Sequence, residues 1–191
     1  MTLIAAKIKY TGMIPMVNAM SDLITSGQIK SFGCAFVAIA LIMIMVLRSF
    51  KLGLISMVPN LFPVLIAIGS MGYAGIYLSM ALVTFGAIII GIAIDDTIHF
   101  FMRYRREFNR TGTYEEALKD TLLTVGRPIT FTTITLAAGF SVFALSDISN
   151  IGDFGLMAGF AIIWALLADF FLAPAMMLLF KPLGAERQLS S

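Results

Sequence analysis

An uncharged run of 43 residues constrains this chain more than any other feature. It covers residues 52–94, between the charged residues Lys51 and Asp95. A membrane-spanning helix needs about 20 apolar residues, so the run is long enough for two spans. Charged residues make up 13% of the whole chain and hydrophobic residues 59%, whereas an ordinary soluble domain has about 25% charged residues. These features exclude a soluble globule.

Charged residues and turn signals divide the chain into five predicted spans. Glycines and tyrosines at 72–77 indicate a turn at the water boundary inside the uncharged run. A short polar turn at 146–153 separates the last two spans. We expect an all-α, polytopic bundle of transmembrane helices. The predicted spans are residues 31–47, 52–74, 78–102, 128–145 and 154–180.

The basic residues predict the orientation of these spans. Lys and Arg accumulate in short loops on the cytoplasmic side of a membrane. With the N-terminus outside, only Lys7, Lys9 and Lys30 of the thirteen basic residues lie outside, and the other ten lie inside. We therefore predict that the N-terminus is outside and the C-terminus inside, with residues 182–191 as a cytoplasmic tail.

Residues 1–30 do not resemble the start of a translocated chain. They contain three lysines and lack the apolar core of a signal peptide. We expect an earlier membrane span upstream, so that the chain is a fragment or one piece of a split protein.

Residues 103–127 hold the densest cluster of charge and predict a cytoplasmic amphipathic helix over 113–126. Thr113 and Glu116 have the spacing of a capping box, in which each side chain accepts from the backbone amide of the other residue. We expect this helix to lie along the membrane surface as a structural linker. The interfacial anchors are predicted to be Arg103, Arg105 and Arg106.

Two adjacent carboxylates, Asp95 and Asp96, lie inside the third predicted span. Each costs on the order of 2.5–3.5 kcal/mol in hydrocarbon, so the two acids need partners or protons. His99 lies three and four residues after them, on the face that they share. Ala87 and Gly91 precede Asp95 at four-residue intervals, and small residues let a neighbouring helix approach closely.

We therefore expect the two acids to face the interior of a bundle and to exchange protons. Two alternatives stay open. The acids either reach to the inner interface, or they form a static ion pair with His99 or an arginine. For His99 itself, a hydrogen-bonded packing role competes with a role in the relay.

The fourth predicted span is rich in hydroxyl groups. Threonines in membrane helices commonly donate to their own backbone carbonyls, but if Thr132 and Thr135 meet Asp95, they can carry a proton chain. Asp169, in the last span, is expected to be a structural partner of the backbone or of an arginine. The hydroxyl residues are Thr130, Thr132, Thr133, Thr135 and Ser141.

Several chemistries find no template in the sequence. The chain has one histidine and one cysteine, no phosphate-binding glycine loop and no nucleophile elbow. We expect no metal, no cofactor and no ATP hydrolysis. The basic residues are not interleaved with aromatic residues, so nucleic acid is not an expected partner. Cys34 is interpreted as a small apolar residue, buried or facing lipid.

Residues 91–97, Gly-Ile-Ala-Ile-Asp-Asp-Thr, resemble the Gly-x-x-x-Asp-Asp signature of the resistance-nodulation-division (RND) superfamily. Further segments resemble its MMPL and hopanoid-exporter branch, and the likeness runs from about Thr11 onward. These segments are 103–107, 114–118, 126–129, 139–140 and 167–174.

The resemblance implies the last five spans of a six-span C-terminal half, with residues 1–30 at the end of a periplasmic domain. It implies export of lipids or other hydrophobic compounds across the bacterial cytoplasmic membrane, driven by the proton gradient. Asp95 and Asp96 are the implied proton relay, His99 supports them, and Thr132 resembles a relay threonine of the multidrug members. The implied partners are membrane lipid, the hydrophobic substrate and the missing N-terminal half with its periplasmic domains. A homo-oligomer is compatible with the sequence, which does not determine the oligomeric state.

Two other functions remain alternatives. The first is a non-transporting lipid-binding or interaction module similar to the sterol-sensing relatives, in which the acids are structural. The second is a protein-export accessory of the Sec type, which shares the superfamily fold. Asp96 argues against the second, because that group usually lacks the second aspartate.

Overall fold

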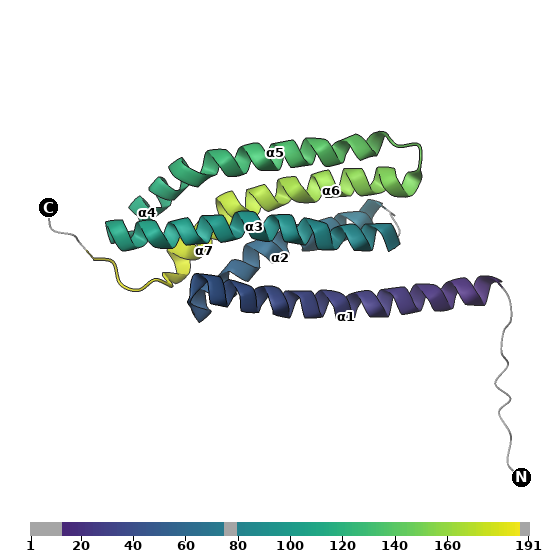
Figure 1. Cartoon of the computed structure of the whole chain (residues 1–191), viewed down its shortest axis with the longest axis horizontal. Helices are drawn as coiled ribbons and strands as arrows, with labels where there is room; N and C mark the ends of the chain where they lie inside the picture. The colour runs from purple at the N-terminus through teal and green to yellow at the C-terminus, as the bar shows by residue number, and fades with distance from the viewer. Residues whose placement is uncertain (1–12, 75–79, 188–191) are drawn as a thin grey trace, which may run out of the picture. The chain divides into compact units, whose positions relative to one another are not determined.

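The computed structural model of the protein describes residues 13–74 and 80–187. These residues are almost entirely helical and include no strand, which confirms the predicted all-α class. The chain divides into two units, residues 1–36 and 37–191. Helix α1 (Met13–Leu47) begins well before the predicted start at residue 31. The second unit holds the other helices and the candidate site (Figure 1).

Helices α2 to α7 follow α1 along the chain. The α-helices are α2 (Phe50–Ala74), α3 (Met80–Thr111), α4 (Tyr114–Thr121), α5 (Arg127–Ser141), α6 (Ser149–Leu167) and α7 (Ala173–Phe180). The shorter turns are the π-helical η1 (Leu122–Gly126) and η3 (Ala168–Leu172) and the 3-10 helix η2 (Val142–Leu145). Four stretches of the described chain are long and apolar enough to cross a membrane: Lys30–Leu47, Phe50–Tyr73, Tyr114–Leu145 and Ile151–Phe180.

Four of the five predicted spans overlap these four stretches and differ from them in extent, whereas the third, residues 78–102, falls on α3, which is not among the four. The turn at 72–77 falls where α2 ends, although residues 75–79 lie outside the described part of the chain. The turn at 146–153 is shorter than expected, because α6 already begins at Ser149. The 32 residues of α3 make a helix of about 48 Å at 1.5 Å per residue, so it is longer than a hydrocarbon core of about 30 Å.

Each π-helical turn ends two residues before a proline. Pro128 stands two residues after Gly126, the last residue of η1, and Pro174 stands two residues after Leu172, the last residue of η3. A proline ring cannot donate a backbone hydrogen bond and collides with the carbonyl four residues earlier in an α-helix. The wider π turn relieves this conflict, so α4 and α5 form one continuous helix, and α6 and α7 form another.

The capping box predicted at Thr113 is wrong. Thr113 is the N-cap of α4, but its side chain makes no capping hydrogen bond, and its buried hydroxyl has no hydrogen-bond partner among the described residues. The start of α4 is fixed by packing against α3 instead. Tyr114 is fully buried, and the hydroxyl of Tyr104 donates to its carbonyl at 2.8 Å.

Charged side chains beyond the apolar part of α3 form ion pairs within this helix and one contact with the end of α1. Glu107 is buried and pairs with Arg103 at 2.6 Å and with Arg110 at 2.7 Å. The hydrogen bond from Arg110 lowers the pKa of Glu107. Arg105 donates to the carbonyl of Leu47 at the end of α1. Of the three predicted interfacial anchors, Arg105 thus also joins α3 to the end of α1, and Arg103 pairs within α3.

The segment after α7 packs against the start of α4. The backbone amide of Leu183 donates to the hydroxyl of Tyr114 at 2.8 Å, and this hydroxyl donates to the carbonyl of Gly184 at 3.1 Å. Residues 188–191 of the predicted tail lie outside the described residues.

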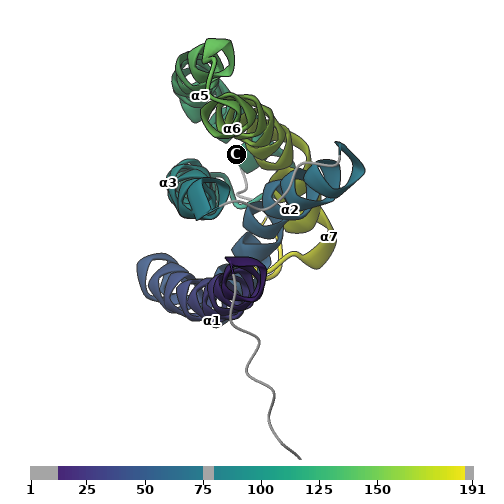
Figure 2. The ribbon, with the colours of Figure 1, turned by 90° about the vertical axis from the view of Figure 1, so that its right-hand side faces the viewer.

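Helix α6 is the central helix of the second unit. It contacts α5, α3 and α2, and the end-on view shows it between α5 and α2 (Figure 2). The sides of the helices that other helices do not cover carry large exposed apolar residues, for example Met45, Phe131 and Leu179. Exposed apolar surface on this scale is expected where lipid is the solvent.

Two glycines let α6 approach α5 closely. A Cβ atom at Gly155 would lie 2.5 Å from the amide nitrogen of Ala144 and 2.7 Å from the carbonyl oxygen of Phe140. A Cβ atom at Gly159 would lie 2.6 Å from the hydroxyl of Ser141. The four-residue spacing of these glycines is the small-xxx-small pattern of packed membrane helices.

We expect Gly155→Ala to destabilise the α5–α6 hairpin by about 1–3 kcal/mol, because the added methyl group meets backbone atoms that cannot move aside. Thermal unfolding of the detergent-solubilised chain measures this loss. Gly139→Ala is the matched control, because a Cβ atom there has no neighbour within 4 Å. Equal melting temperatures for the two variants would show that the close approach does not hold the hairpin.

Candidate functional site

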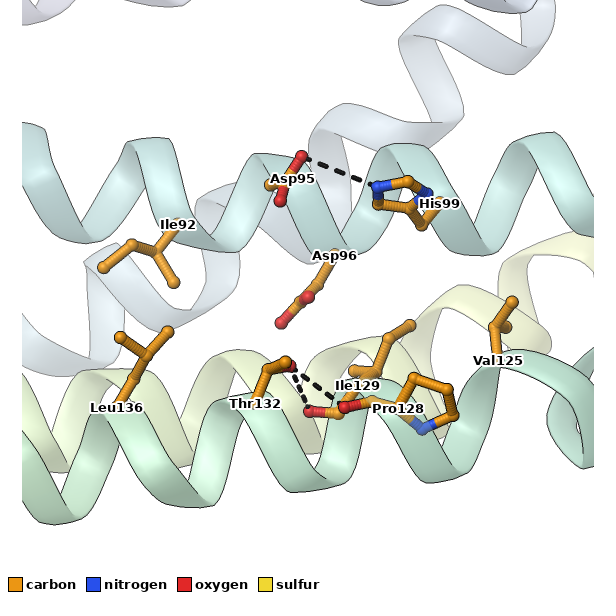
Figure 3. Close-up of a pocket in the computed structure, with 9 residues that line it drawn as sticks. All are labelled: Ile92, Asp95, Asp96, His99, Val125, Pro128, Ile129, Thr132 and Leu136. Atoms are coloured by element: carbon orange, nitrogen blue, oxygen red, sulfur yellow. Dashed lines mark hydrogen bonds and ion pairs between the residues drawn. The ribbon is translucent and has the colours of Figure 1, made fainter.

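The two adjacent acids of α3 point in different directions. Asp96 extends toward α5 and is half-buried, whereas the side chain of Asp95 is 75% exposed (Figure 3). This divergence follows from the helix, in which neighbouring residues are about 100° apart. The sequence predicts that both acids face the interior of a helix bundle. Within this chain Asp96 does so and Asp95 does not.

Asp95 has a partner on its own helix. Its Oδ1 lies 3.8 Å from Nε2 of His99, and the imidazole is 68% exposed. Gly91, one turn before Asp95, is exposed and has no atom within 4 Å of a Cβ position. We call Gly91, Asp95 and His99 the open face of α3, since the described residues leave it uncovered. The side chain of Ala87 lies outside the described part.

Asp96 is bound to α5 through one hydroxyl group. Oγ1 of Thr133, which is 2% exposed, lies 3.1 Å from Oδ2 of Asp96. The same hydroxyl lies 2.7 Å from the carbonyl of Ile129, four residues earlier in α5. Thr133 therefore has two acceptors for its single proton.

The other hydroxyl groups of this helix donate to its own backbone, as one of the two interpretations predicted. Thr132 lies 3.1 Å from the carbonyl of Pro128 and 3.0 Å from that of Ile129. Thr135 is exposed and donates to the carbonyl of Phe131. The structure places Thr133 rather than Thr132 on the acid, and the relay role of Thr132 stays a prediction. Thr130 and Ser141 follow the same pattern toward Gly126 and Ala137.

A cavity of about 430 Å³ lies beside the acids, between α3 and the start of α5 (Figure 3). A water molecule occupies about 30 Å³ in the liquid, so the cavity has room for several. It places the polar groups of both acids, His99 and Thr132 within one space. The cavity is lined by Ile92, Asp95, Asp96, His99, Val125, Pro128, Ile129, Thr132 and Leu136.

A third acid, Asp169, is buried at the junction of α2, α3 and η3. It is 3% exposed, and its Oδ1 lies 2.7 Å from Oγ1 of Thr97. Thr97 in turn lies 2.9 Å from Oδ1 of Asn60. The prediction that Asp169 partners the backbone or an arginine is wrong, because the packing of η3 against α2 and α3 turns this acid toward two polar side chains.

Sequence reasoning did not assign a role to Asn60 or Thr97. Asn60 is one of the few polar residues in the long uncharged run and stands one residue after Pro59. Thr97 follows Asp96 directly. A buried polar residue within an apolar span costs free energy unless it is hydrogen-bonded. The presence of polar residues in such spans was therefore the sequence signal that could have indicated a hydrogen-bonded pair. Among the described residues, no three His, Cys, Asp or Glu side chains gather as a metal site requires.

Comparison with known proteins identifies the family of this chain. The model of the MMPL family matches residues 2–189. The chain belongs to the MMPL family. The family lies within the RND superfamily, so the resemblance inferred from residues 91–97 is confirmed. Membership makes the chain a multi-pass membrane protein of a transporter family.

Three curated relatives match almost the whole chain. The hopanoid transporter HpnN of Burkholderia multivorans is 27% identical over 95% of the chain, and HpnN of Rhodopseudomonas palustris is 26% identical over 96%. The protein MJ1562 of Methanocaldococcus jannaschii is 30% identical over 88%. The chain spans about a fifth of the length of each hopanoid transporter (21%) and 44% of the archaeal protein.

We expect Thr133→Val to destabilise the chain by about 0.6 kcal/mol, the average for an interhelical hydrogen bond in a membrane protein, and by no more than about 1.7 kcal/mol. Detergent-induced unfolding of the purified chain measures this loss. Thr135→Val is the matched control, since the hydroxyl of Thr135 donates only within its own helix. If the two variants lose equal stability, the Asp96–Thr133 contact does not join α3 to α5.

Proposed function

We propose that this chain is part of an RND-type exporter that moves lipids or other hydrophobic compounds and is driven by the proton gradient. One observation carries the proposal. Two adjacent carboxylates stand on α3 beside a cavity with room for water, and one of them, Asp96, is within reach of a hydroxyl on α5. Carboxylates placed within a membrane span are commonly part of ion or proton pathways.

The contact between Asp96 and Thr133 suits a carboxyl group that gains and loses a proton. When Asp96 is ionised, Thr133 donates to it. When Asp96 is protonated, the hydroxyl of Thr133 turns to the carbonyl of Ile129, 2.7 Å away, and accepts from the acid. Neither state leaves a polar group of the pair without a partner, so both protonation states are accommodated.

Asp95 and His99 give the relay its second site. We propose that the open face of α3 is covered in the working transporter by the other membrane half, which supplies a further partner to Asp95. A proton that crosses the membrane through such a relay contributes about 2.3 kcal/mol per 100 mV of membrane potential. The proton gradient then replaces ATP hydrolysis and any bound cofactor as the energy source.

The nature of the substrate rests on the relatives. Two of them are named hopanoid transporters, which favours a hydrophobic lipid as the cargo. We propose the bacterial cytoplasmic membrane as the location, with the N-terminus outside and the C-terminus inside, because this orientation places ten of the thirteen basic residues on the cytoplasmic side.

The test uses everted membrane vesicles from cells that carry each variant at the chromosomal locus of the gene. We expect Asp95→Asn and Asp96→Asn each to reduce substrate-induced proton movement, followed with a pH-sensitive dye, and lipid export to the level of a gene deletion. Asp147→Asn, an exposed acid in the turn before α6, is the control that keeps both activities. Membrane levels of the chain are compared by immunoblot.

Normal proton-dependent export in the Asp95→Asn, Asp96→Asn double variant would remove the proposal. A specific observation favours a second candidate in that event. Asp169 shows that this chain also holds an intramembrane acid in a purely hydrogen-bonded junction. A non-transporting lipid-binding module would then be the better description, and sterol or hopanoid binding that persists in the double variant would identify it.

A further inference from the structure

The junction around Asp169 contains more acceptors than donors. Oγ1 of Thr97 contacts two oxygen atoms, Oδ1 of Asn60 at 2.9 Å and Oδ1 of Asp169 at 2.7 Å. A hydroxyl group has only one proton to donate. In one of these two contacts, therefore, the proton must come from the partner of Thr97, which is either Asn60 or Asp169.

Asn60 cannot supply that proton. Its Nδ2 donates to the backbone carbonyl of Ser56 at 2.9 Å, and this carbonyl can only accept. If the amide were turned around, its oxygen would face the carbonyl oxygen of Ser56 at hydrogen-bond distance. The orientation of Asn60 is thus fixed, with its oxygen toward Thr97.

Only Asp169 remains as a donor. We propose that Asp169 is a neutral carboxylic acid in this conformation and that its proton holds α2 against α3. The hydrogen bonds then run in one direction, from Asp169 to Thr97, from Thr97 to Asn60 and from Asn60 to the carbonyl of Ser56. Every contact in this row has one donor and one acceptor.

The surroundings of Asp169 agree with a neutral side chain. Asp169, Thr97 and Asn60 are 3%, 1% and 2% exposed, and a buried carboxylate without a cation costs several kcal/mol. The titratable group that faces Asp169 from α3 is another acid, Asp96. Among the described residues of the other elements packed on it, α7 has no charged residue, and α2 and α6 have theirs only near their first turns.

Loss of this proton has a structural consequence. An ionised Asp169 would take the proton of Thr97 as its hydrogen bond. Two acceptor oxygens, of Thr97 and Asn60, would then face each other at 2.9 Å and separate. Because Thr97 directly follows Asp96 in α3, the junction adjoins the proposed proton site, and this link alone rests on the proposed function. Asp169 is thus a positioning residue whose protonation state sets the contact between α2 and α3.

Thr133 and Thr97 show why the inference applies to Asp169 and not to Asp96. The second acceptor of Thr133 is a backbone carbonyl of its own helix, which an amide of the same helix also serves. The second acceptor of Thr97 is the oxygen of Asn60 on another helix. Of these two acids, Asp169 is therefore the one whose protonation state is fixed by the contacts around it.

Infrared spectroscopy of the full chain in lipid vesicles tests the protonation state directly. At neutral pH we expect a carbonyl stretch of a protonated carboxyl group that falls to background in Asp169→Asn and persists in Asp96→Asn. We expect Thr97→Val to shift this band toward the position of a carboxyl group without a hydrogen bond. Thr97→Ser, which keeps the hydroxyl, should leave the band in place.

Identical carboxyl regions in the wild type and Asp169→Asn would overturn the inference. A second measurement needs no variant, in case Asp169→Asn does not fold. Solid-state NMR of the chain labelled with carbon-13 at the aspartate carboxyl groups should contain a signal of a neutral acid at neutral pH. A spectrum with ionised carboxyl groups only would overturn the inference as well. Neither experiment measures transport, so its failure is distinguishable from failure of the proposed function.

Discussion

The cost of a carboxyl group in an apolar layer is the constraint on which this structure depends. Three acids lie along the long helices of the second unit, Asp95 and Asp96 on α3 and Asp169 in the turn η3 between α6 and α7, and each has a different environment. Asp169 is buried and hydrogen-bonded to Thr97. Asp96 contacts Thr133 beside a cavity. Asp95 pairs with His99 on the open face of α3. Asp169 is thus buried, Asp96 is half-buried and Asp95 is exposed on the open face of α3. This difference in burial separates the structural acid, Asp169, from the two acids that can exchange protons.

The helices around the acids are arranged by small residues and by prolines. Gly155 and Gly159 bring α6 against the hairpin of α5, and α6 continues into the π-helical turn that carries Asp169. The other π-helical turn leads into α5, which carries Thr133. Prolines that follow both turns fix their positions in the sequence. Single-turn π segments often mark functional sites, and here one adjoins the half-buried acid and the other contains the buried acid.

Charge and hydropathy predicted the fold because a span in lipid must be apolar and must satisfy its own backbone hydrogen bonds, which makes it a helix. The helix boundaries near Leu47, Ala74 and Leu145 are close to their predicted places. Contacts between distant residues were beyond the same reasoning. Asp169 and Thr97 are 72 residues apart, and their pairing depends on a π turn that no local pattern of charge reveals. The capping box failed because a buried tyrosine, and not the preceding threonine, fixes the start of α4.

The central claim is that Asp95 and Asp96 take up and release protons in the membrane. Carbodiimide modification tests it directly, because a hydrophobic carbodiimide adds to a carboxyl group only while that group carries a proton. Intact membranes are treated over a range of pH, and mass spectrometry locates the adduct on the chain. We expect adducts on Asp95 or Asp96 that decrease as the pH rises and that stop proton movement. No adduct on either residue at any pH would contradict the claim.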